Sequence, residues 1–320
     1  MKNIVTLSDY NYLYKGLALY ESLISTSLEK FNLYYLCLDD DSYNKLKSLN
    51  LPNLIPIHTN VEGLSRDPNL SYSTNNPSGK KFRHYCFSLS SRGVKYLFKK
   101  YKLEDIFYID SDIFFYEDIG LLKKESGDKA VAIFPHLHVP KPTHVGAYNV
   151  GVIYFKNNSE GNEVLNFWED CVINPKNKYR NSGYDTCGDQ KYVELFEELF
   201  PESIHIYGSK NIVHGAPYNY DYFVFLNFLK KVVKFARPPG YQNIEYIDKE
   251  YIMPFFHFMG FFPDFENNSY APSNEPNNQR FMLDPLIRLA YNDYFLFCKN
   301  ISERYGLSSN NSKIKEAKYA

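Results

Sequence analysis

Two aspartates, Asp110 and Asp112, stand one residue apart where an apolar run of the chain ends. Residues 106–109 read Ile-Phe-Tyr-Ile, the pattern of a strand buried in a sheet that is covered on both faces. Ligands of open α/β sheets bind at the carboxyl ends of such strands. Carboxylates this close repel each other unless they share a cation, and Mg2+ or Mn2+ takes carboxylate oxygens while keeping positions for phosphate. The spacing therefore predicts a metal-assisted phosphate or diphosphate site.

The alternative for the same triplet is a solvated turn, because Asp is a good turn former and helix cap. The flanking residues favour the metal site, since the chain continues as the apolar run 113–116 and does not break into Gly or Asn. Charges that interrupt a hydrophobic element lose solvation free energy, which is normally recovered from a partner ion. We therefore expect the two carboxylates to hold a divalent cation.

Composition and charge exclude several classes of protein. The chain has 320 residues, 44% of them hydrophobic, which is enough for one large α/β domain or a domain with an appendage. A net charge of -1 lacks the basic excess of nucleic-acid-binding domains. No apolar run approaches the roughly 18 residues that span a bilayer, so we expect a soluble, cytoplasmic protein. The five cysteines include no C-x-x-C pair, which predicts reduced thiols without a disulfide framework or zinc site.

Apolar runs and helical stripes alternate along most of the chain, which predicts an α/β fold with a mainly parallel sheet. The predicted strands are residues 3–7, 33–38, 54–58, 106–109, 130–134, 150–155, 203–207 and 252–258. The predicted helices are residues 12–26, 43–49, 82–101, 163–172, 190–199, 223–234 and 283–305. Residues 60–80, rich in Asn, Ser, Pro and Gly, predict a long surface loop, and such loops are often functional.

The character of the chain changes near its end, which predicts two parts. Residues 263–279 are rich in Asn, Pro and Ser and read as a linker. We therefore assign residues 1–262 to one α/β domain and residues 263–320 to a linker, a C-terminal helix and a polar tail. The helix is expected to pack against the domain; the alternative is docking to a membrane surface.

Further segments carry residues that could do chemistry. The strand after Asn149 contains Gly151, which either lets a ligand approach the backbone or accommodates a β-bulge. Asp189, within Gly-Asp-Gln, opens a predicted helix and either caps its N–H groups or points into a cleft. Gly215 lies in a turn-rich aromatic loop. His257 stands alone in an apolar strand, where a histidine is either a satisfied core residue or a ligand.

Together and in this order, these segments resemble the bacterial nucleotide-diphospho-sugar glycosyltransferases of the GT-A fold. YLYKGLALYESL looks like the first helix of that family, and YIDSD is similar to its metal-binding D-x-D strand. YNVGVIYF resembles its N-x-G strand, GDQKYVELF its G-D-Q-K-Y helix start, HGAPYN its A-P-W-N loop and FHFMGF its F-H-F-x-G-F strand. The resemblance spans about residues 2–262. It implies a Rossmann-like, mainly parallel mixed sheet flanked by helices, with the C-terminal helical extension outside it.

The resemblance implies a divalent metal, Mn2+ or Mg2+, at the D-x-D strand. Asp112 and His257 would ligate the ion, and Asp110 would contact the ion or the ribose. The metal would act as a Lewis acid that neutralises charge on the departing nucleoside diphosphate. Two departures from the family, Tyr218 in place of Trp and D-S-D-I in place of D-A-D-L, keep this chemistry and alter the sugar pocket.

The resemblance also assigns the remainder of the donor site. The implied contacts to base, ribose and phosphate are Ser8, Asp9, Tyr10, Asp39, Lys81, Arg83, Ser111 and Gly215. Asn149 and Asp189 would line the sugar and acceptor end, with Asp189 as the general base for the acceptor hydroxyl. If the reaction retains anomeric configuration, Asp189 or Gln190 would lie near the anomeric carbon without acting as that base.

The expected function is metal-dependent transfer of a sugar from a nucleotide-sugar donor to a hydroxyl of a glycan or lipid-linked acceptor, in assembly of a bacterial surface polysaccharide. One rival is a haloacid-dehalogenase-like phosphatase, which shares the apolar D-x-D pattern. In that family the motif lies on the first strand with Thr or Val two residues later, whereas Phe114 stands there in this chain. The other rival is a catalytically inactive GT-A scaffold that binds a glycan or a partner.

Overall fold

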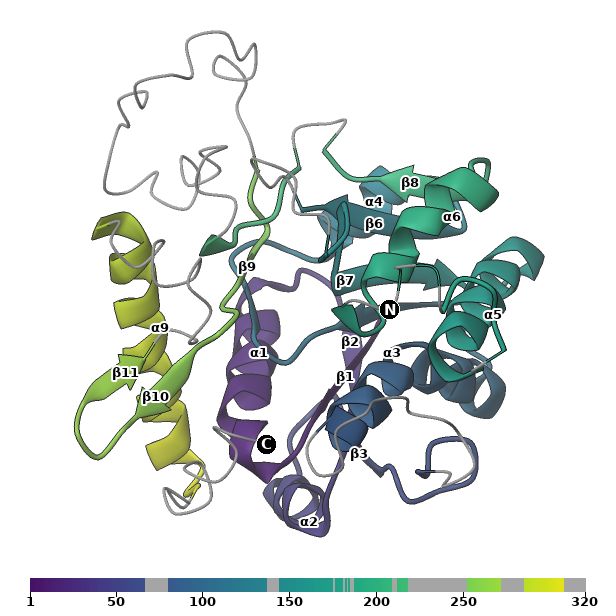
Figure 1. The fold of residues 1–320 in the computed structure, drawn as a ribbon. Helices are drawn as coiled ribbons and strands as arrows, with labels where there is room; N and C mark the ends of the chain where they lie inside the picture. Colours follow the sequence, from purple (N-terminus) through teal and green to yellow (C-terminus); the bar gives the residue numbers. More distant parts are fainter. Residues whose placement is uncertain are drawn as a thin grey trace, which may run out of the picture.

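A mixed sheet of seven strands forms the centre of the chain, in the order β3-β2-β1-β4-β7-β6-β8 (Figure 1). The computed structural model describes residues 1–66, 80–136, 144–174, 176–180, 182, 184, 187–208, 212–217, 252–271 and 285–307. The strands are β1 Lys2–Ser8, β2 Phe31–Cys37, β3 Leu54–His58, β4 Asp105–Ile109, β6 Val131–Pro135, β7 Tyr148–Lys156 and β8 Ile204–Ile206.

Most neighbouring strands of this sheet are parallel, as the β-α alternation predicts. Strands β3, β2, β1 and β4 run parallel, and β8 runs parallel to β6. Strand β7 is antiparallel to both β4 and β6. The carboxyl ends of β2, β1 and β4 therefore meet at one edge of the sheet, where α/β proteins bind their ligands.

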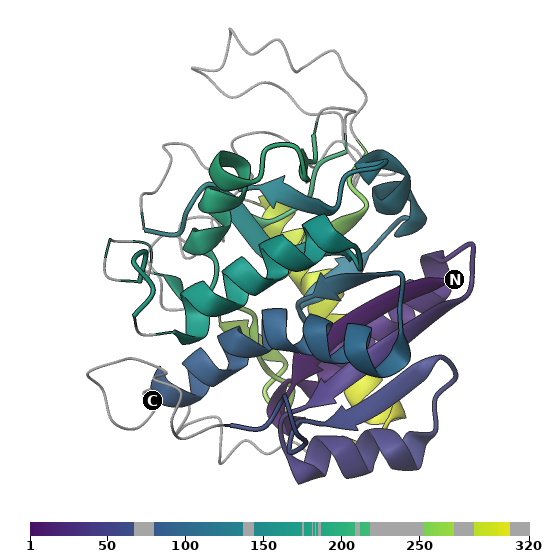
Figure 2. The ribbon, with the colours of Figure 1, turned by 90° about the vertical axis from the view of Figure 1, so that its right-hand side faces the viewer.

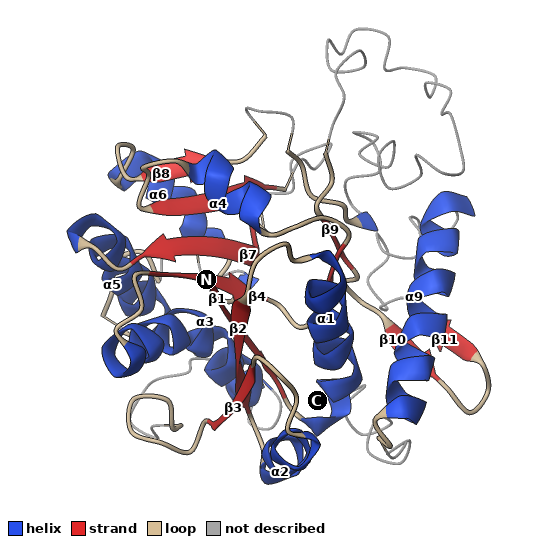
Figure 3. Ribbon diagram, turned by 180° about the vertical axis from the view of Figure 1, so that it is seen from behind, coloured by secondary structure: helices blue, strands red, loops and turns tan. Residues whose placement is uncertain are grey.

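Helices cover both faces of the sheet, because successive residues of each strand point to opposite faces. The helices are α1 Leu13–Thr26, α2 Asp40–Leu49, α3 Lys80–Tyr101, α4 Gly120–Ser126, α5 Ser159–Ile173, α6 Glu194–Leu199 and α9 Pro285–Arg304. Ile4 and Phe107 belong to a hydrophobic cluster with α1 and α9, while Val5 and Tyr108 belong to a second cluster with α3 and α5. Figure 2 views the face with α3 and α5, and Figure 3 shows α1 and α9 from behind.

A small second sheet brings two distant segments together. Strand β5, Ile113–Phe115, pairs antiparallel with β9, Phe255–His257, so that Ile113 lies opposite His257. Pro254 has no N–H for a ladder, and its carbonyl accepts from the backbone N–H groups of Tyr116 and Glu117. The predicted strand 252–258 is therefore shorter than expected, and Ile252 makes only an isolated bridge to Ile212.

Three further predictions differ from the structure. The predicted linker contains a hairpin, β10 Phe262–Asp264 and β11 Ser269–Ala271, because the Asp264 carboxylate accepts from the Asn267 N–H and Asn268 adopts the left-handed turn conformation. The helix predicted at 190–199 starts as a 3-10 turn, Lys191–Val193, before α6. Helix α4 was not predicted, since its seven residues are too few to show a periodic apolar stripe.

The C-terminal helix α9 packs against the sheet domain, as expected. Tyr294 stacks on Phe258 with ring centroids 3.8 Å apart, and the Tyr291 hydroxyl donates to the Met259 carbonyl at 2.8 Å. Both tyrosines lie in the same hydrophobic cluster as Leu17 of α1. Among the described residues, no helix is long and apolar enough to cross a membrane. The predicted helix 223–234 and Tyr218 lie outside the described residues.

Candidate active site

Asp110 and Asp112 lie in the turn that links β4 to β5, at the edge where the parallel strands end. The Asp110 N–H donates to the Gly151 carbonyl of β7 at 2.9 Å, and the Ile113 N–H donates to the Asp110 carbonyl at 3.2 Å. The backbone is thus held on both sides of the turn. This arrangement presents both carboxylates from a rigid part of the sheet.

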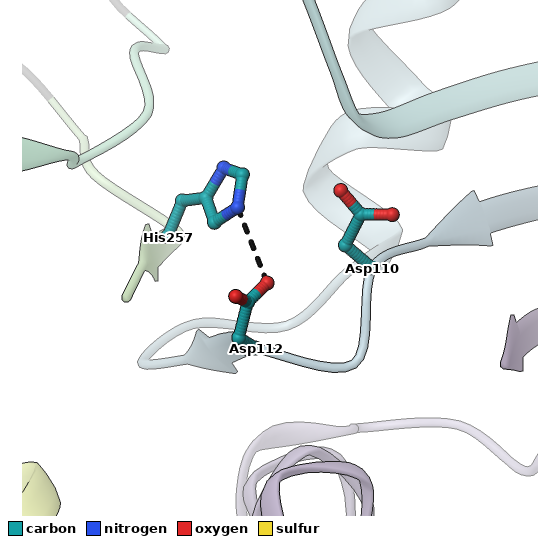
Figure 4. Close-up of side chains that lie close together, drawn as sticks. All are labelled: Asp110, Asp112 and His257. Carbon is teal, nitrogen blue, oxygen red and sulfur yellow. Dashed lines mark ion pairs between the residues drawn. The ribbon is translucent and has the colours of Figure 1, made fainter. Parts of the chain in front are cut away.

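His257 joins the two aspartates through the β5–β9 pairing. The Phe258 N–H donates to the Asp112 carbonyl at 2.9 Å, and His257 Nε2 lies 3.2 Å from Asp112 Oδ1 (Figure 4). One ligand atom from each of Asp110, Asp112 and His257 can be chosen so that all three lie within 4.8 Å of one another. The structure therefore assembles the group that the resemblance implied.

Gly151 allows the His257 ring to occupy this position. A Cβ atom on Gly151 would lie 3.0 Å from His257 Nδ1 and 2.7 Å from Asn149 Oδ1, which is tighter than ordinary side-chain contacts. This close approach is not the ligand contact of one sequence interpretation, because the approaching group is the imidazole of the chain itself. The register of β6 against β7 shifts between Ala132 and Phe134, across the β7 residues that include Gly151, which agrees with the other interpretation, a β-bulge.

Replacing Gly151 by Ala is expected to displace His257 from Asp112 while the sheet remains folded. Loss of an outer partner of a metal ligand typically weakens metal binding about 10–100-fold, and displacing a ligand such as His257 is expected to weaken it at least as much. Calorimetric titration with Mn2+ measures it. Val150→Ala is the matched control, because Val150 lies on the same strand but belongs to the cluster on the opposite face. Equal Mn2+ affinity in Gly151→Ala and the wild type would contradict the assignment.

Cationic neighbours hold Asp112 ionised. His257 faces Oδ1, and Nζ of Lys15 lies 3.7 Å from Oδ2. Burial favours the neutral acid, but the charges of His257 and Lys15 outweigh it and hold the pKa of Asp112 below its usual range. Burial likewise opposes protonation of His257, and the negative charges of Asp112 and Asp110 overcome it and raise the His257 pKa.

Two further carboxylic acids are less readily ionised. Burial raises the pKa of Asp110 to about 6, with Asp112 adding to the effect and His257 opposing it, while the Tyr108 hydroxyl donates to Asp110 Oδ1 at 2.8 Å. Burial and the charge of Asp110 raise the pKa of Asp189 to about 7, although the Ser90 hydroxyl donates to its Oδ2 at 2.7 Å. Three neighbouring carboxyl groups, with Asp189 buried and Asp110 and Asp112 half-buried, are costly to keep ionised unless cations lie among them.

Asp189 is buried and does not cap a helix. Its carboxylate accepts from Ser90 of α3, its backbone carbonyl accepts from the Trp168 indole at 2.9 Å, and the following 3-10 turn has no side-chain cap. Gly188 adopts a left-handed φ of +58°, which turns the chain before Asp189. Of the two interpretations of this residue, capping is therefore wrong.

The other residues expected at the sugar end have defined contacts. Asn149 uses both ends of its amide: Oδ1 accepts from the Gly151 N–H at 2.7 Å, and Nδ2 lies 3.2 Å from His136 Nε2. Gln190 donates to the Val145 carbonyl at 2.9 Å. Gly215 flanks β9, because its carbonyl accepts from the His257 N–H at 2.8 Å. Asn149 and Gly215 thus surround His257, and Gln190 follows Asp189.

The residues expected to hold the base and ribose lie at the ends of β1 and β2. Asp39 caps α2 by accepting from the Ser42 N–H and also accepts from the Tyr10 N–H at 3.0 Å. Asp9 accepts from the Tyr12 N–H, and its pKa is raised by burial and by Asp39. The hydroxyls of Ser8 and Tyr35 lie 2.6 Å apart. Asp9 and Asp39 therefore stabilise local turns as well as lining this edge.

Three residues expected near phosphate are placed only in part. Lys81 and Arg83 belong to the first turn of α3, and their side chains lie outside the described residues. Ser111 is buried between the two aspartates. The structure thus brings together Asp110, Asp112 and His257, and it does not place the side chains of Lys81 and Arg83 relative to them.

Lys15 is one of three residues of this site that sequence analysis missed. It lies on the first turn of α1 with its side chain 2% exposed, and burial lowers its pKa although Asp112 opposes this. Its position within the apolar sequence LYKGLALY was a signal, because a lysine on the buried stripe of a helix needs a partner. Tyr108 and Ser90 were missed as well, since a tyrosine in a strand and a serine in a helix carry no special pattern.

The residues present fit a hard divalent ion. Two carboxylates and an imidazole are acceptable ligands for Mn2+, and the carboxylates also suit Mg2+. The 3.2 Å between His257 Nε2 and Asp112 Oδ1 is close to the separation of two neighbouring ligands at about 2.1 Å from one ion.

The chain has a GT-A type α/β fold, which it shares with solved structures. Among solved structures, an active-site mutant of LgtC is similar with a TM-score of 0.50 and 15% identity, covering 88% of this chain and 94% of LgtC. Mouse xyloside xylosyltransferase 1 is similar with a TM-score of 0.48 and 13% identity, covering 81% of this chain and 97% of that protein.

Sequence comparison finds two relatives from Bacillus subtilis (strain 168). The uncharacterized protein YfnF is 27% identical over 203 residues, which cover 59% of this chain and 63% of YfnF. The uncharacterized protein YfnD is 23% identical over 206 residues, covering 63% of this chain and 64% of YfnD. The matched segments thus span a little under two thirds of either relative. No family model matches the chain.

Proposed function

We propose that this chain is a metal-dependent glycosyltransferase that moves a sugar from a nucleotide-diphosphate-sugar donor to a hydroxyl acceptor. The observation that carries the proposal is the convergence of Asp110, Asp112 and His257 at the carboxyl edge of a GT-A sheet. Residues 1–262 would carry catalysis, and residues 263–320 would support them through α9. The acceptor would be a glycan or a lipid-linked sugar in assembly of a bacterial surface polysaccharide.

Asp110, Asp112 and His257 would hold the metal, either Mn2+ or Mg2+. When bound, the metal would supply Lewis acidity that lowers the charge developing on the departing diphosphate. The protein contributes orientation: the β4–β5 turn and β9 fix the three ligands, and Gly151 leaves room for the imidazole. The donor's base and ribose would lie over Ser8, Asp9, Tyr10 and Asp39, at the ends of the neighbouring strands. Lys81 or Arg83, together with Ser111 and Gly215, would complete the contacts to the donor.

Asn149, Asp189 and Gln190 would line the sugar and acceptor end. With a pKa raised to about 7, Asp189 is poised to exchange a proton near neutral pH, which suits a general base for the acceptor hydroxyl. In a retaining reaction, Asp189 or Gln190 would instead lie beside the anomeric carbon. Product stereochemistry, determined by NMR with the identified donor, separates these two roles.

A thermal-shift panel of nucleoside diphosphates and nucleotide sugars, each with Mn2+ and with EDTA, tests the proposal. One nucleotide is expected to stabilise the protein in the presence of Mn2+ and to lose that effect in EDTA. At a ligand concentration of about 100 times Kd, the free energy of unfolding should rise by roughly 2.7 kcal/mol. Inorganic phosphate with Mn2+ is the control for nonspecific anion binding.

The absence of any thermal shift would contradict the proposal. If a protein with a cooperative melt shows no shift with any nucleotide and Mn2+, the transferase proposal fails. The second candidate, a catalytically inactive GT-A scaffold, then predicts binding on a glycan array that survives both EDTA and Asp112→Asn. The arrangement of Asp110, Asp112, Asp189 and His257 favours the enzyme, because a binding module does not need three carboxyl groups beside one histidine.

A further inference from the structure

Lys15 occupies an unusual position for a lysine. It belongs to α1, yet its side chain is only 2% exposed and its Nζ lies 3.7 Å from Asp112 Oδ2. Three aromatic rings also contact the ammonium, with centroids at 4.5 Å for Tyr12, 5.9 Å for Phe261 and 5.8 Å for Phe262. Ring faces attract a cation. The first turn of α1 and the segment after β9 thus hold a positive charge beside the metal-binding group.

Among the described residues, the Lys15 ammonium makes no short hydrogen bond. At 3.7 Å, the contact with Asp112 is an ion pair that is longer than a hydrogen bond. The ammonium has three N–H donors, and its contacts among the described residues are this one carboxylate and three ring faces. Lysine is a common point-charge ligand of phosphate.

The net charge at the site becomes more positive when a metal enters. Without metal, the carboxylates of Asp110 and Asp112 face one lysine and one histidine. A divalent ion held by Asp112 would be close to the Lys15 ammonium, and the two cations would repel each other at short range. A diphosphate that contacts both cations removes this repulsion.

We propose that Lys15 is a built-in counter-cation of Asp112 that weakens divalent-metal binding to the free protein and contacts the diphosphate, so that metal and diphosphate bind together. This inference rests on the proposed function of the site and adds the order of binding to it. Because coupling between two ligands is reciprocal, metal strengthens diphosphate binding by the same factor that diphosphate strengthens metal binding. Its consequence is that the free protein does not hold the metal tightly before the donor arrives.

The test is Mn2+ binding, followed by electron paramagnetic resonance of free Mn2+, with and without inorganic pyrophosphate. Pyrophosphate is chosen because it carries the diphosphate group without a base or sugar. The full chain is compared with Lys15→Met and Lys15→Arg. Lys47→Met is the matched control, because Lys47 also lies over an aromatic ring, 5.6 Å from Tyr43, on the exposed surface of α2.

Lys15→Met is expected to bind Mn2+ alone about tenfold more tightly than the wild type, as removal of a nearby unit charge predicts. In Lys15→Met, the factor by which pyrophosphate strengthens Mn2+ binding is also expected to fall about tenfold. Lys15→Arg, which keeps the charge, should retain most of the coupling, and Lys47→Met should match the wild type. A purely structural Lys15 would leave both the Mn2+ affinity and the coupling of a folded variant unchanged, and that result would overturn the inference.

Two outcomes separate this inference from the proposed function. If the wild type binds Mn2+ equally tightly with and without pyrophosphate, the inference fails, and no variant is needed to show it. A thermal shift by a nucleotide that depends on Mn2+ would still support the transferase. If Mn2+ binds under neither condition, the metal site itself is wrong and the proposed function fails with it. Should Lys15→Met not fold, Lys15→Gln, which keeps a polar tip without the charge, carries the same expectation.

Discussion

Replacing Asp112 by Asn is expected to reduce sugar transfer by about 1,000-fold or more. The amide has the same shape as the carboxylate but carries no negative charge, so it is a much weaker ligand for a divalent metal. Losing one electrostatic contact that stabilises developing charge costs about 100–1,000-fold in kcat, and here the metal that provides such contacts is itself released. Steady-state kinetics with the nucleotide sugar found by thermal shift, at saturating Mn2+, measures this loss. Nucleotide stabilisation by Mn2+ is expected to disappear as well.

The chain contains a matched control for this substitution. Asp118 also pairs with a buried lysine: Lys2 Nζ lies 2.6 Å from Asp118 Oδ1, and the two side chains are 4% and 14% exposed. The corresponding values for Lys15 and Asp112 are 2% and 20%. Removing either aspartate leaves a buried ammonium without its partner, which is commonly destabilising by several kcal/mol. Asp118→Asn should therefore lose stability similarly while retaining turnover.

This comparison separates a role in chemistry from a role in folding. If Asp112→Asn retains more than about a tenth of wild-type kcat under conditions where both variants are folded, the metal role of Asp112 is wrong. If Asp118→Asn loses turnover to the same degree, the loss in Asp112→Asn reflects destabilisation. Circular dichroism in the near ultraviolet establishes that each variant is folded before kinetics are compared.

Replacing Gly16 by Ala is expected to lower the free energy of unfolding by at least about 1–3 kcal/mol, the usual cost of overpacking a core. A Cβ on Gly16 would lie 1.9 Å from the Tyr35 hydroxyl oxygen and 2.6 Å from two carbons of its ring. Tyr35 is fully buried, so it cannot swing into solvent. The gain of up to about 1 kcal/mol in helix propensity from Gly to Ala is too small to offset this clash.

A double-mutant cycle with Tyr35→Phe measures the clash directly. Removal of the hydroxyl deletes the nearest contact, so Gly16→Ala should cost less in the Tyr35→Phe background than in the wild type. Urea denaturation of the four proteins gives the coupling free energy. A neutral or stabilising effect of Gly16→Ala in the wild type would mean that Gly16 of α1 does not lie against the Tyr35 ring of β2.

Local patterns predicted most of the elements. The alternation of apolar runs with helical stripes correctly gave β1, β3, α1, α5 and α9, because burial of a strand or a helix face leaves a periodic mark in the sequence. The same reasoning missed the β10–β11 hairpin, whose Asn and Pro residues indicate a linker when considered alone. Its strands are three residues each, which is too short for alternation to be recognised.

The sequence by itself determined that the protein is α/β, that two carboxylates follow its fourth strand, and, through the resemblance, that His257 would meet them. Each of these three conclusions can be drawn from neighbouring residues or from the order of the motifs along the chain. Only the tertiary structure decided that Lys15 faces Asp112, that the His257 ring lies against Gly151 and that Ser90 contacts a buried Asp189. These contacts join segments far apart in sequence, and their geometry depends on how whole helices and strands pack, which no local pattern records.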